Sequence, residues 1–143
     1  MVGIRQSENG SGNVVFGITA LVEEYEFYER LVAEQPRVAR SYLAYFGDIY
    51  LSEPQLLPPL DVVTLFHLCE FSAHNTASPE YGGLTDLKLT VALTEKLPAG
   101  GHILFYTGSF AFDDAKRVIA DWERQCPVER VSEFKTLLVY RKR

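Results

Sequence analysis

The sequence predicts an α/β protein with a mostly parallel sheet and an antiparallel C-terminal strand. Apolar, β-rich runs alternate with segments of helical periodicity, which is the order expected for this fold class. The runs at 60–68 and 102–107 are joined by a helical segment and the turn Pro98-Ala99-Gly100-Gly101, as in a strand–helix–strand crossover. Two further strand-like runs follow each other directly at the end of the chain, so we expect them to pair antiparallel.

Each element in the first half is predicted from its own residues. A short apolar strand covers Val14 to Ile18, and a helix follows, ending before Pro36. Its apolar positions recur at helical spacing: Leu21, Tyr25, Tyr28 and Val32. A second strand spans Tyr42 to Tyr45, and residues 52–59 form a proline-rich loop. The run Val62 to Leu68 is apolar apart from Thr64, which is typical of a strand covered on both faces.

The second half continues the alternation. A polar loop at 72–83 leads to a helix from Thr85 to Lys96, which we expect to bury Leu87, Val91 and Leu84. A strand runs from His102 to Thr107. The next helix has an apolar face at i, i+3, i+4 and i+7: Ala115, Val118, Ile119 and Trp122. The closing strands are predicted at 128–131 and 136–140. We therefore expect an irregular segment at 1–13 and a single α/β domain at 14–143.

Composition limits the classes of partner. The chain has 143 residues, 47% of them hydrophobic, and a formal net charge of −5. An acidic protein is a poor general binder of phosphate backbones, so we predict no nucleic-acid partner. No apolar run approaches the roughly 18 residues that span a bilayer, so we predict no membrane partner. No signal peptide opens the chain, and we expect a cytoplasmic protein.

The cysteines and histidines predict neither a disulfide framework nor a metal site. Cys69 and Cys126 are the only cysteines, and we expect two free thiols. His67, Cys69, Glu70 and His74 are all potential zinc ligands, but their spacing matches no paired-ligand pattern. A nucleophilic pair of Cys69 and His74 is disfavoured, because no strand-to-helix nucleophile elbow surrounds Cys69.

Three phrases resemble class I S-adenosylmethionine-dependent methyltransferases. Phe46-Gly47-Asp48 is similar to the Gly-Asp that ends the third strand of that family, and Leu60-Asp61-Val62-Val63 is similar to its fourth strand. The segment Leu97 to Leu104 resembles its proline–glycine–glycine turn into the fifth strand. The resemblance covers roughly Val14 to Arg143, the later two-thirds of the family domain. It implies a Rossmann-like, methyltransferase-type sheet that is incomplete at the N-terminus.

The resemblance implies a set of site residues. Contacts to S-adenosylmethionine would come from two strand ends: Gly47, Asp48, Ile49, Phe66, His67 and Leu68. Gly-Asp is also common turn chemistry, so Asp48 has a structural alternative. His67 or Glu70 would act as the base that deprotonates the methyl acceptor, and a structural role for both is the alternative. Alternation along a strand would put His67 and Cys69 on one face and Glu70 on the other.

The sequence also departs from the family pattern. The glycine-rich cofactor loop is not found, and Asn9-Gly10-Ser11-Gly12 is rejected because no strand precedes it and no helix follows it. Thr19 stands where the family has an acidic residue that holds the ribose, and Glu23 and Glu24 are expected to be poor substitutes. The family's first strand, which lies between its second and fourth, is missing. Val2 to Arg5 could form a stub strand, the gap could close by re-pairing or with a partner, or the chain could be a piece of a longer protein.

The functional expectation is a methyltransferase with a small-molecule acceptor. The alternative is a non-catalytic, methyltransferase-like module that acts through self-association, for example as a homodimer, or through a partner chain. An exposed strand edge favours that alternative. The polar side chains at the end of the run 62–68 favour the enzyme.

Overall fold

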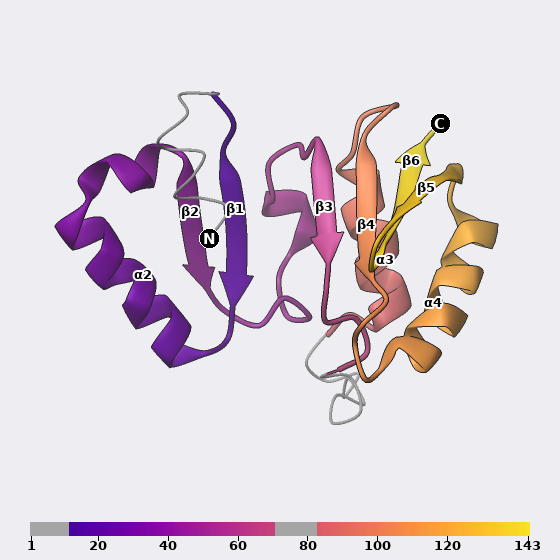
Figure 1. Cartoon of the computed structure of the whole chain (residues 1–143), viewed down its shortest axis with the longest axis horizontal. Helices are drawn as coiled ribbons and strands as arrows, with labels where there is room; N and C mark the ends of the chain where they lie inside the picture. The colour runs from indigo at the N-terminus through magenta and orange to yellow at the C-terminus, as the bar shows by residue number, and fades with distance from the viewer. Residues whose placement is uncertain (1–11, 71–82) are drawn as a thin grey trace. The chain divides into compact units, whose positions relative to one another are not determined.

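A computed structural model describes residues 12–70 and 83–143. The chain forms two compact units, the first ending at Ser52 and the second beginning at Glu53. Figure 1 shows the elements of each unit, which in chain order are β1 (Val15–Thr19), α2 (Val22–Glu34), η1 (Pro36–Arg40), β2 (Tyr42–Phe46), η2 (Pro54–Leu56), β3 (Val62–Leu65), α3 (Asp86–Glu95), β4 (His102–Tyr106), α4 (Phe112–Gln125), β5 (Val128–Phe134) and β6 (Leu137–Lys142). The predicted single domain at 14–143 stays a prediction.

The first unit is a parallel strand pair with one helix. β1 and β2 pair from Val15 opposite Tyr42 to Thr19 opposite Phe46. Helix α2 packs on this pair through aromatic rings: Tyr28 lies 5.2 Å from Tyr42, measured between ring centroids. The Tyr28 hydroxyl donates a hydrogen bond to the Tyr42 carbonyl at 3.2 Å. The strand–helix–strand order predicted for residues 14–45 is therefore confirmed.

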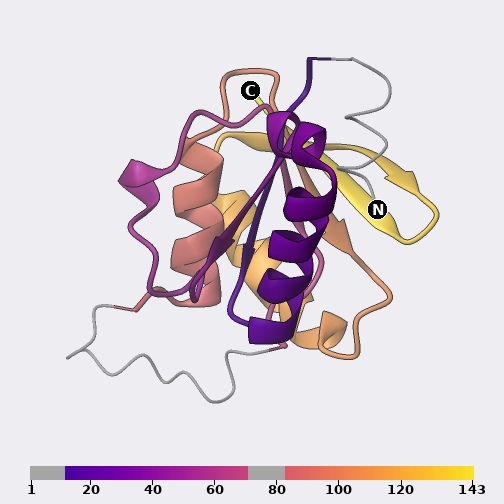
Figure 2. The same ribbon diagram turned by 90° about the vertical axis from the view of Figure 1, so that its left-hand side faces the viewer.

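The second unit is a four-stranded mixed sheet in the order β3-β4-β6-β5. β3 and β4 are parallel, whereas β6 pairs antiparallel with both β4 and β5. Helices α3 and α4 lie on the same face of this sheet (Figures 1 and 2). On that face the Trp122 ring lies 5.2 Å from Phe105 and 5.1 Å from Tyr140, and all three side chains are buried. The α/β class and the antiparallel C-terminal strand are confirmed.

A ladder of buried hydrogen bonds runs along α3. The Trp122 indole donates to the Thr94 hydroxyl at 2.8 Å, and that hydroxyl donates to the Thr90 carbonyl at 2.7 Å. The Thr90 hydroxyl in turn donates to the Asp86 carbonyl at 2.7 Å. Because each buried polar atom has a partner, two threonines can face the core without a desolvation penalty.

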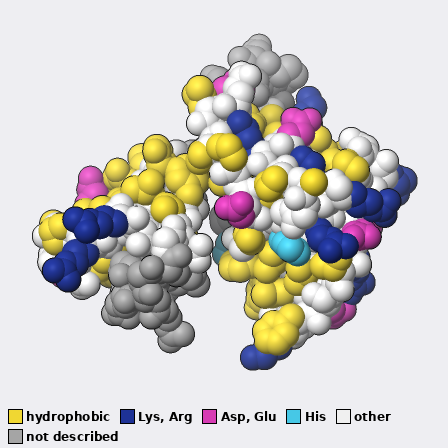
Figure 3. Space-filling model, turned by 90° about the horizontal axis from the view of Figure 1, so that it is seen from above, with side chains coloured by type: hydrophobic (Ala, Val, Ile, Leu, Met, Phe, Trp, Pro, Cys, Tyr) yellow, Lys and Arg dark blue, Asp and Glu magenta, His cyan; other side chains and the backbone are white. Residues whose placement is uncertain are grey.

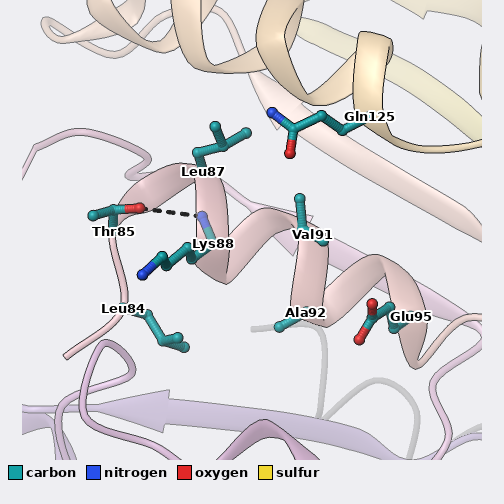
Figure 4. A pocket seen from close by; sticks show the side chains of 8 residues that line it. All are labelled: Leu84, Thr85, Leu87, Lys88, Val91, Ala92, Glu95 and Gln125. Carbon is teal, nitrogen blue, oxygen red and sulfur yellow. Dashed lines mark hydrogen bonds between the residues drawn. The ribbon is translucent and has the colours of Figure 1, made fainter. Parts of the chain in front are cut away.

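The buried face of α3 differs from the predicted one. Leu89 and Leu93 are buried together with the two threonines, whereas Leu84, Leu87 and Val91 are only partly covered. These last three line a surface groove of about 440 Å³ on α3, with Gln125 at its α4 side (Figure 4). The prediction was wrong because it considered apolar positions only, whereas the i−4 hydrogen bonds of Thr90 and Thr94 allow these two residues to take core positions.

Strand β3 is shorter and more exposed than predicted. It ends at Leu65 instead of Leu68, and its burial alternates, with Val63 and Leu65 buried and Val62 55% exposed. In the described residues of the second unit, helices cover one face of the sheet only, so the expectation of a strand covered on both faces was wrong.

The described strands form two sheets, with β1 and β2 in one and the remaining four in the other. In the part of the chain that the structure describes, no strand is hydrogen-bonded to both β1 and β3, as the missing family strand would be. The proposed stub strand at Val2 to Arg5 lies outside the described residues.

We predict that Thr94→Val destabilises the fold by about 1–3 kcal/mol, because the buried Trp122 N–H loses its acceptor. Thr90→Val is the matched control, since it is equally buried and loses the same type of i−4 bond but receives no indole N–H. We expect it to cost about 0.5–1 kcal/mol. Urea unfolding of the two variants measures both costs, and equal costs would contradict a structural role for the indole bond.

Candidate functional site

The turn that follows β3, residues 66–70, carries His67, Cys69 and Glu70. These residues do not alternate across a sheet as predicted, because the strand has already ended. The Glu70 N–H donates to the His67 carbonyl at 3.2 Å, and Cys69 adopts a φ of 68°. That left-handed conformation is unfavourable for a residue with a β-carbon, so the surrounding structure must hold the turn in place.

Glu70 joins His67 to a serine from a different loop. The His67 Nδ1 lies 2.8 Å from the Glu70 Oε2, and the Ser109 hydroxyl donates to the Glu70 Oε1 at 2.5 Å. The Glu70 side chain is only 10% exposed, whereas His67 is 67% exposed. The Ser109 hydroxyl and then His67 hold the pKa of Glu70 below its ordinary value, against the opposing effect of burial. Glu70 is thus an ionised carboxylate that faces a surface histidine.

Asp86 fixes the same turn from the start of α3. The Cys69 N–H donates to the Asp86 Oδ1 at 3.0 Å, and Asp86 is buried. Burial, followed by the nearby carboxylates of Asp86 and Asp114, raises the pKa of the Cys69 thiol to about 12. A thiol with that pKa is protonated at neutral pH, so Cys69 is a poor nucleophile. The alternative partner His74 lies outside the described residues.

A second group of polar side chains lies at the carboxyl end of the strands of the first unit. The Thr19 hydroxyl, at the end of β1, donates to the Glu24 carboxylate at 2.6 Å. Glu24 therefore brings a carboxylate to the strand end that carries Thr19. Sequence spacing did not predict this contact, because Glu24 lies five residues further on, in the first turn of α2.

Gly47 and Asp48 lie beside this strand end. The Gly47 N–H donates to the Thr19 carbonyl at 2.9 Å, and a β-carbon built on Gly47 would meet no atom within 4 Å. One carboxylate oxygen of Asp48 accepts the Tyr50 N–H at 2.9 Å, so the predicted turn-forming role is present. The Ile49 carbonyl accepts the Ser52 hydroxyl at 2.6 Å in the same turn. These residues form an open strand end with carboxylates from Asp48 and Glu24.

The structure brings some of the predicted site residues together. His67 and Glu70 are in contact, and Phe66 precedes them in the same turn, but the Leu68 side chain is buried in the core. Ser109 was missed, since a lone serine 39 residues away from Glu70 carries no sequence signal.

Among residues 12–70 and 83–143, no group of three or more His, Cys, Asp or Glu side chains could hold a metal ion. The same described residues include no helix that is long and apolar enough to cross a bilayer.

The comparisons find similar solved structures only. No family model and no curated protein matches the chain. A provisionally assigned methyltransferase from Streptococcus mutans, crystallised with SAH, aligns at 14% identity and a TM-score of 0.56 over 90% of this chain and 76% of that chain. An rRNA methylase from Streptococcus thermophilus aligns at 11% identity and a TM-score of 0.54 over 90% of this chain and 73% of that chain.

A third similar structure is named for a different substrate, a precorrin. Precorrin-6y C5,15-methyltransferase from Geobacter metallireducens aligns at 15% identity and a TM-score of 0.52, over 89% of this chain and 64% of that chain. At such low identities the similarity shows the fold and no more. The predicted resemblance to class I S-adenosylmethionine-dependent methyltransferases is confirmed at that level.

We predict that Glu70→Gln removes part of the acid sensitivity of folding. The folded-state pKa of Glu70 lies below its unfolded value, so its stabilisation is complete above the unfolded value of about 4.3. It is lost as the pH falls through the lowered folded-state pKa. Urea unfolding at pH 7 and at successively lower pH should show a smaller acid-induced loss in Glu70→Gln than in the wild type. The exposed Glu53→Gln serves as control, and an unchanged loss in Glu70→Gln would contradict the prediction.

Proposed function

We propose that this protein is an S-adenosylmethionine-dependent methyltransferase with a small-molecule acceptor and with His67 as general base. The observation that carries the proposal is the His67–Glu70–Ser109 cluster, which lies just beyond the carboxyl end of β3. Ligands of open α/β sheets bind at the carboxyl ends of the strands. The similar structures are methyltransferases, one of them with SAH bound, which supports the same reaction class.

The first unit offers residues that fit the cofactor. Carboxylates of Asp48 and Glu24 suit the amine of adenine and the hydroxyls of ribose, since ionised oxygens accept strong hydrogen bonds. Gly47, Asp48 and Ile49 are proposed to hold the nucleoside at the strand end of the first unit. In the second unit, Phe66, His67 and Leu68 are proposed as cofactor contacts in their own right. When bound, S-adenosylmethionine supplies a methyl group activated by a positively charged sulfur.

The role of His67 follows from its contact with Glu70. An ionised carboxylate only accepts hydrogen bonds, so the Nδ1 that faces Glu70 carries the hydrogen. The Nε2 is then the basic nitrogen and can accept the proton of a hydroxyl or amine acceptor. The imidazolium that results is stabilised by Glu70, and Ser109 keeps that carboxylate oriented.

RNA is the competing class of methyl acceptor, because one similar structure is named an rRNA methylase. The charges near the cluster favour a small molecule instead. Glu70 belongs to the cluster, and the carboxylates of Asp86 and Asp114 lie close enough to raise the pKa of the Cys69 thiol. Arg117 pairs with Asp114. Figure 3 views the molecule from the amino ends of β3 and β4, the end away from this cluster, and there Lys and Arg side chains lie among acidic and hydrophobic ones. A phosphate backbone would need a concentrated basic surface.

The non-catalytic alternative is not favoured, because the similar structures are methyltransferases and nothing in the described residues supports a homodimer.

A cytoplasmic location belongs to the same proposal. Cys69 and Cys126, the two cysteines of the chain, are not joined by a disulfide, which suits a reducing compartment.

We predict micromolar binding of S-adenosylhomocysteine, measured by isothermal titration of the full chain. Asp48→Asn and Glu24→Gln should each weaken it about tenfold, because a charged acceptor is worth about 1.5 kcal/mol or more. The asparagine retains an oxygen for the Tyr50 N–H, so the turn is preserved.

Glu53→Gln is the matched control and should leave the dissociation constant unchanged. A folded protein that does not bind S-adenosylhomocysteine at millimolar concentration would overturn the proposed function. Binding that is unaffected by both Asp48→Asn and Glu24→Gln would overturn the assignment of the cofactor residues.

A further inference from the structure

Three exposed aromatic side chains come from the same two segments as the acid–base cluster, the end of β3 and the end of β4 with the loop that follows it. Phe66 is 43%, Tyr106 is 36% and Phe110 is 86% exposed. All three belong to the second unit. Large exposed aromatic side chains gathered at one place mark a binding surface more often than isolated ones do.

The sheet sets two of these rings side by side. Leu65 pairs with Phe105 at the end of the β3–β4 ladder, so Phe66 and Tyr106 are the next residues along the two strands. Their ring centroids lie 6.2 Å apart at an interplanar angle of 62°. Phe66 directly precedes His67 in the sequence, so one ring of this aromatic pair is next to the histidine along the chain.

The third ring is tied to the cluster by Ser109. The Ser109 hydroxyl bonds to Glu70 and also accepts the Ala111 N–H at 3.1 Å, which fixes the loop that carries Phe110. Phe66 and Phe110 are thus the neighbours of the two residues that Glu70 joins. Both ends of the hydrogen-bonded cluster are therefore adjacent in sequence to an exposed aromatic residue.

Gly108 makes room for Tyr106. A β-carbon at Gly108 would overlap the Tyr106 hydroxyl oxygen, so the ring lies against the backbone of this loop. Any larger residue at 108 would displace the Tyr106 ring. The position of the ring therefore depends on the loop between β4 and α4.

We propose that the methyl acceptor is a planar aromatic molecule without negative charge that bears a hydroxyl or amine. It would lie against Phe66, Tyr106 and Phe110 and direct that group to His67. This inference rests on the proposed methyltransferase function and specifies its acceptor. Aromatic rings attract a planar π-system, and the carboxylates of Glu70, Asp86 and Asp114 in and near the cluster repel an anion.

The test uses three matched probes in isothermal titrations of the full chain with S-adenosylhomocysteine present. 2-Naphthol is planar, neutral and carries a hydroxyl. Decahydro-2-naphthol has the same skeleton without aromaticity, and naphthalene-2-sulfonate adds a negative charge. We expect 2-naphthol to bind at least about threefold more tightly than either of the others, in the range of one aromatic contact.

The variants Phe66→Leu and Phe110→Leu should each weaken 2-naphthol about three- to tenfold. Phe134→Leu is the control, because Phe134 is 61% exposed but lies on the β5–β6 hairpin. Gly108→Ala should also weaken binding by displacing Tyr106. Circular dichroism confirms that each variant is folded.

Equal binding of 2-naphthol and its saturated analogue, or equal effects of Phe110→Leu and Phe134→Leu, would overturn the aromatic acceptor. Tighter binding of a single-stranded RNA oligonucleotide than of 2-naphthol would overturn the exclusion of anions. S-adenosylhomocysteine binding without 2-naphthol binding would remove this inference and leave the proposed function intact. Binding of 2-naphthol by a chain that does not bind S-adenosylhomocysteine would remove the proposed function.

Discussion

The geometry of the candidate site depends on the carboxylate of Asp86, which accepts the Cys69 N–H at 3.0 Å. Cys69 needs such a bond because its left-handed backbone is unfavourable without support. The bond joins the turn after β3 to the start of α3. Ser109 holds the next residue, Glu70, from the loop before α4. Two side chains from separate segments thus fix the turn on which His67 is presented, as a preorganised acid–base group requires.

The anchor at Asp86 is continuous with the core. The threonine ladder of α3 begins at the Asp86 carbonyl and ends at the Trp122 indole, so the helix cannot rotate without breaking a buried hydrogen bond. Trp122 is in turn packed between Phe105 of β4 and Tyr140 of β6. The exposed imidazole therefore has a rigid support, although it lies on the surface.

Most of the fold was predictable from local patterns, because apolar periodicity and turn residues reflect the faces that a helix or strand must bury. Four features were not. β3 ends at Leu65 and is followed by a turn whose Cys69 N–H bonds to the Asp86 side chain, and the buried threonines of α3 bond to backbone carbonyls. Apolar periodicity registers neither feature. The contacts of Ser109 with Glu70 and of Glu24 with Thr19 depend on tertiary placement. His67 and Glu70 were each predicted as a candidate base, and their direct contact follows only from the turn.

Hydrogen exchange at the Cys69 amide, followed by NMR in the wild type and in Asp86→Ala, tests most directly whether the turn is held by Asp86. Exchange in the wild type should be slowed about tenfold or more relative to an unstructured peptide, because the N–H is bonded to a buried carboxylate. The substitution should release that protection and leave the Ile103 amide of β4 protected. Unprotected exchange of the Cys69 amide in the folded wild type, or protection that survives Asp86→Ala, would contradict the claim that Asp86 holds the turn.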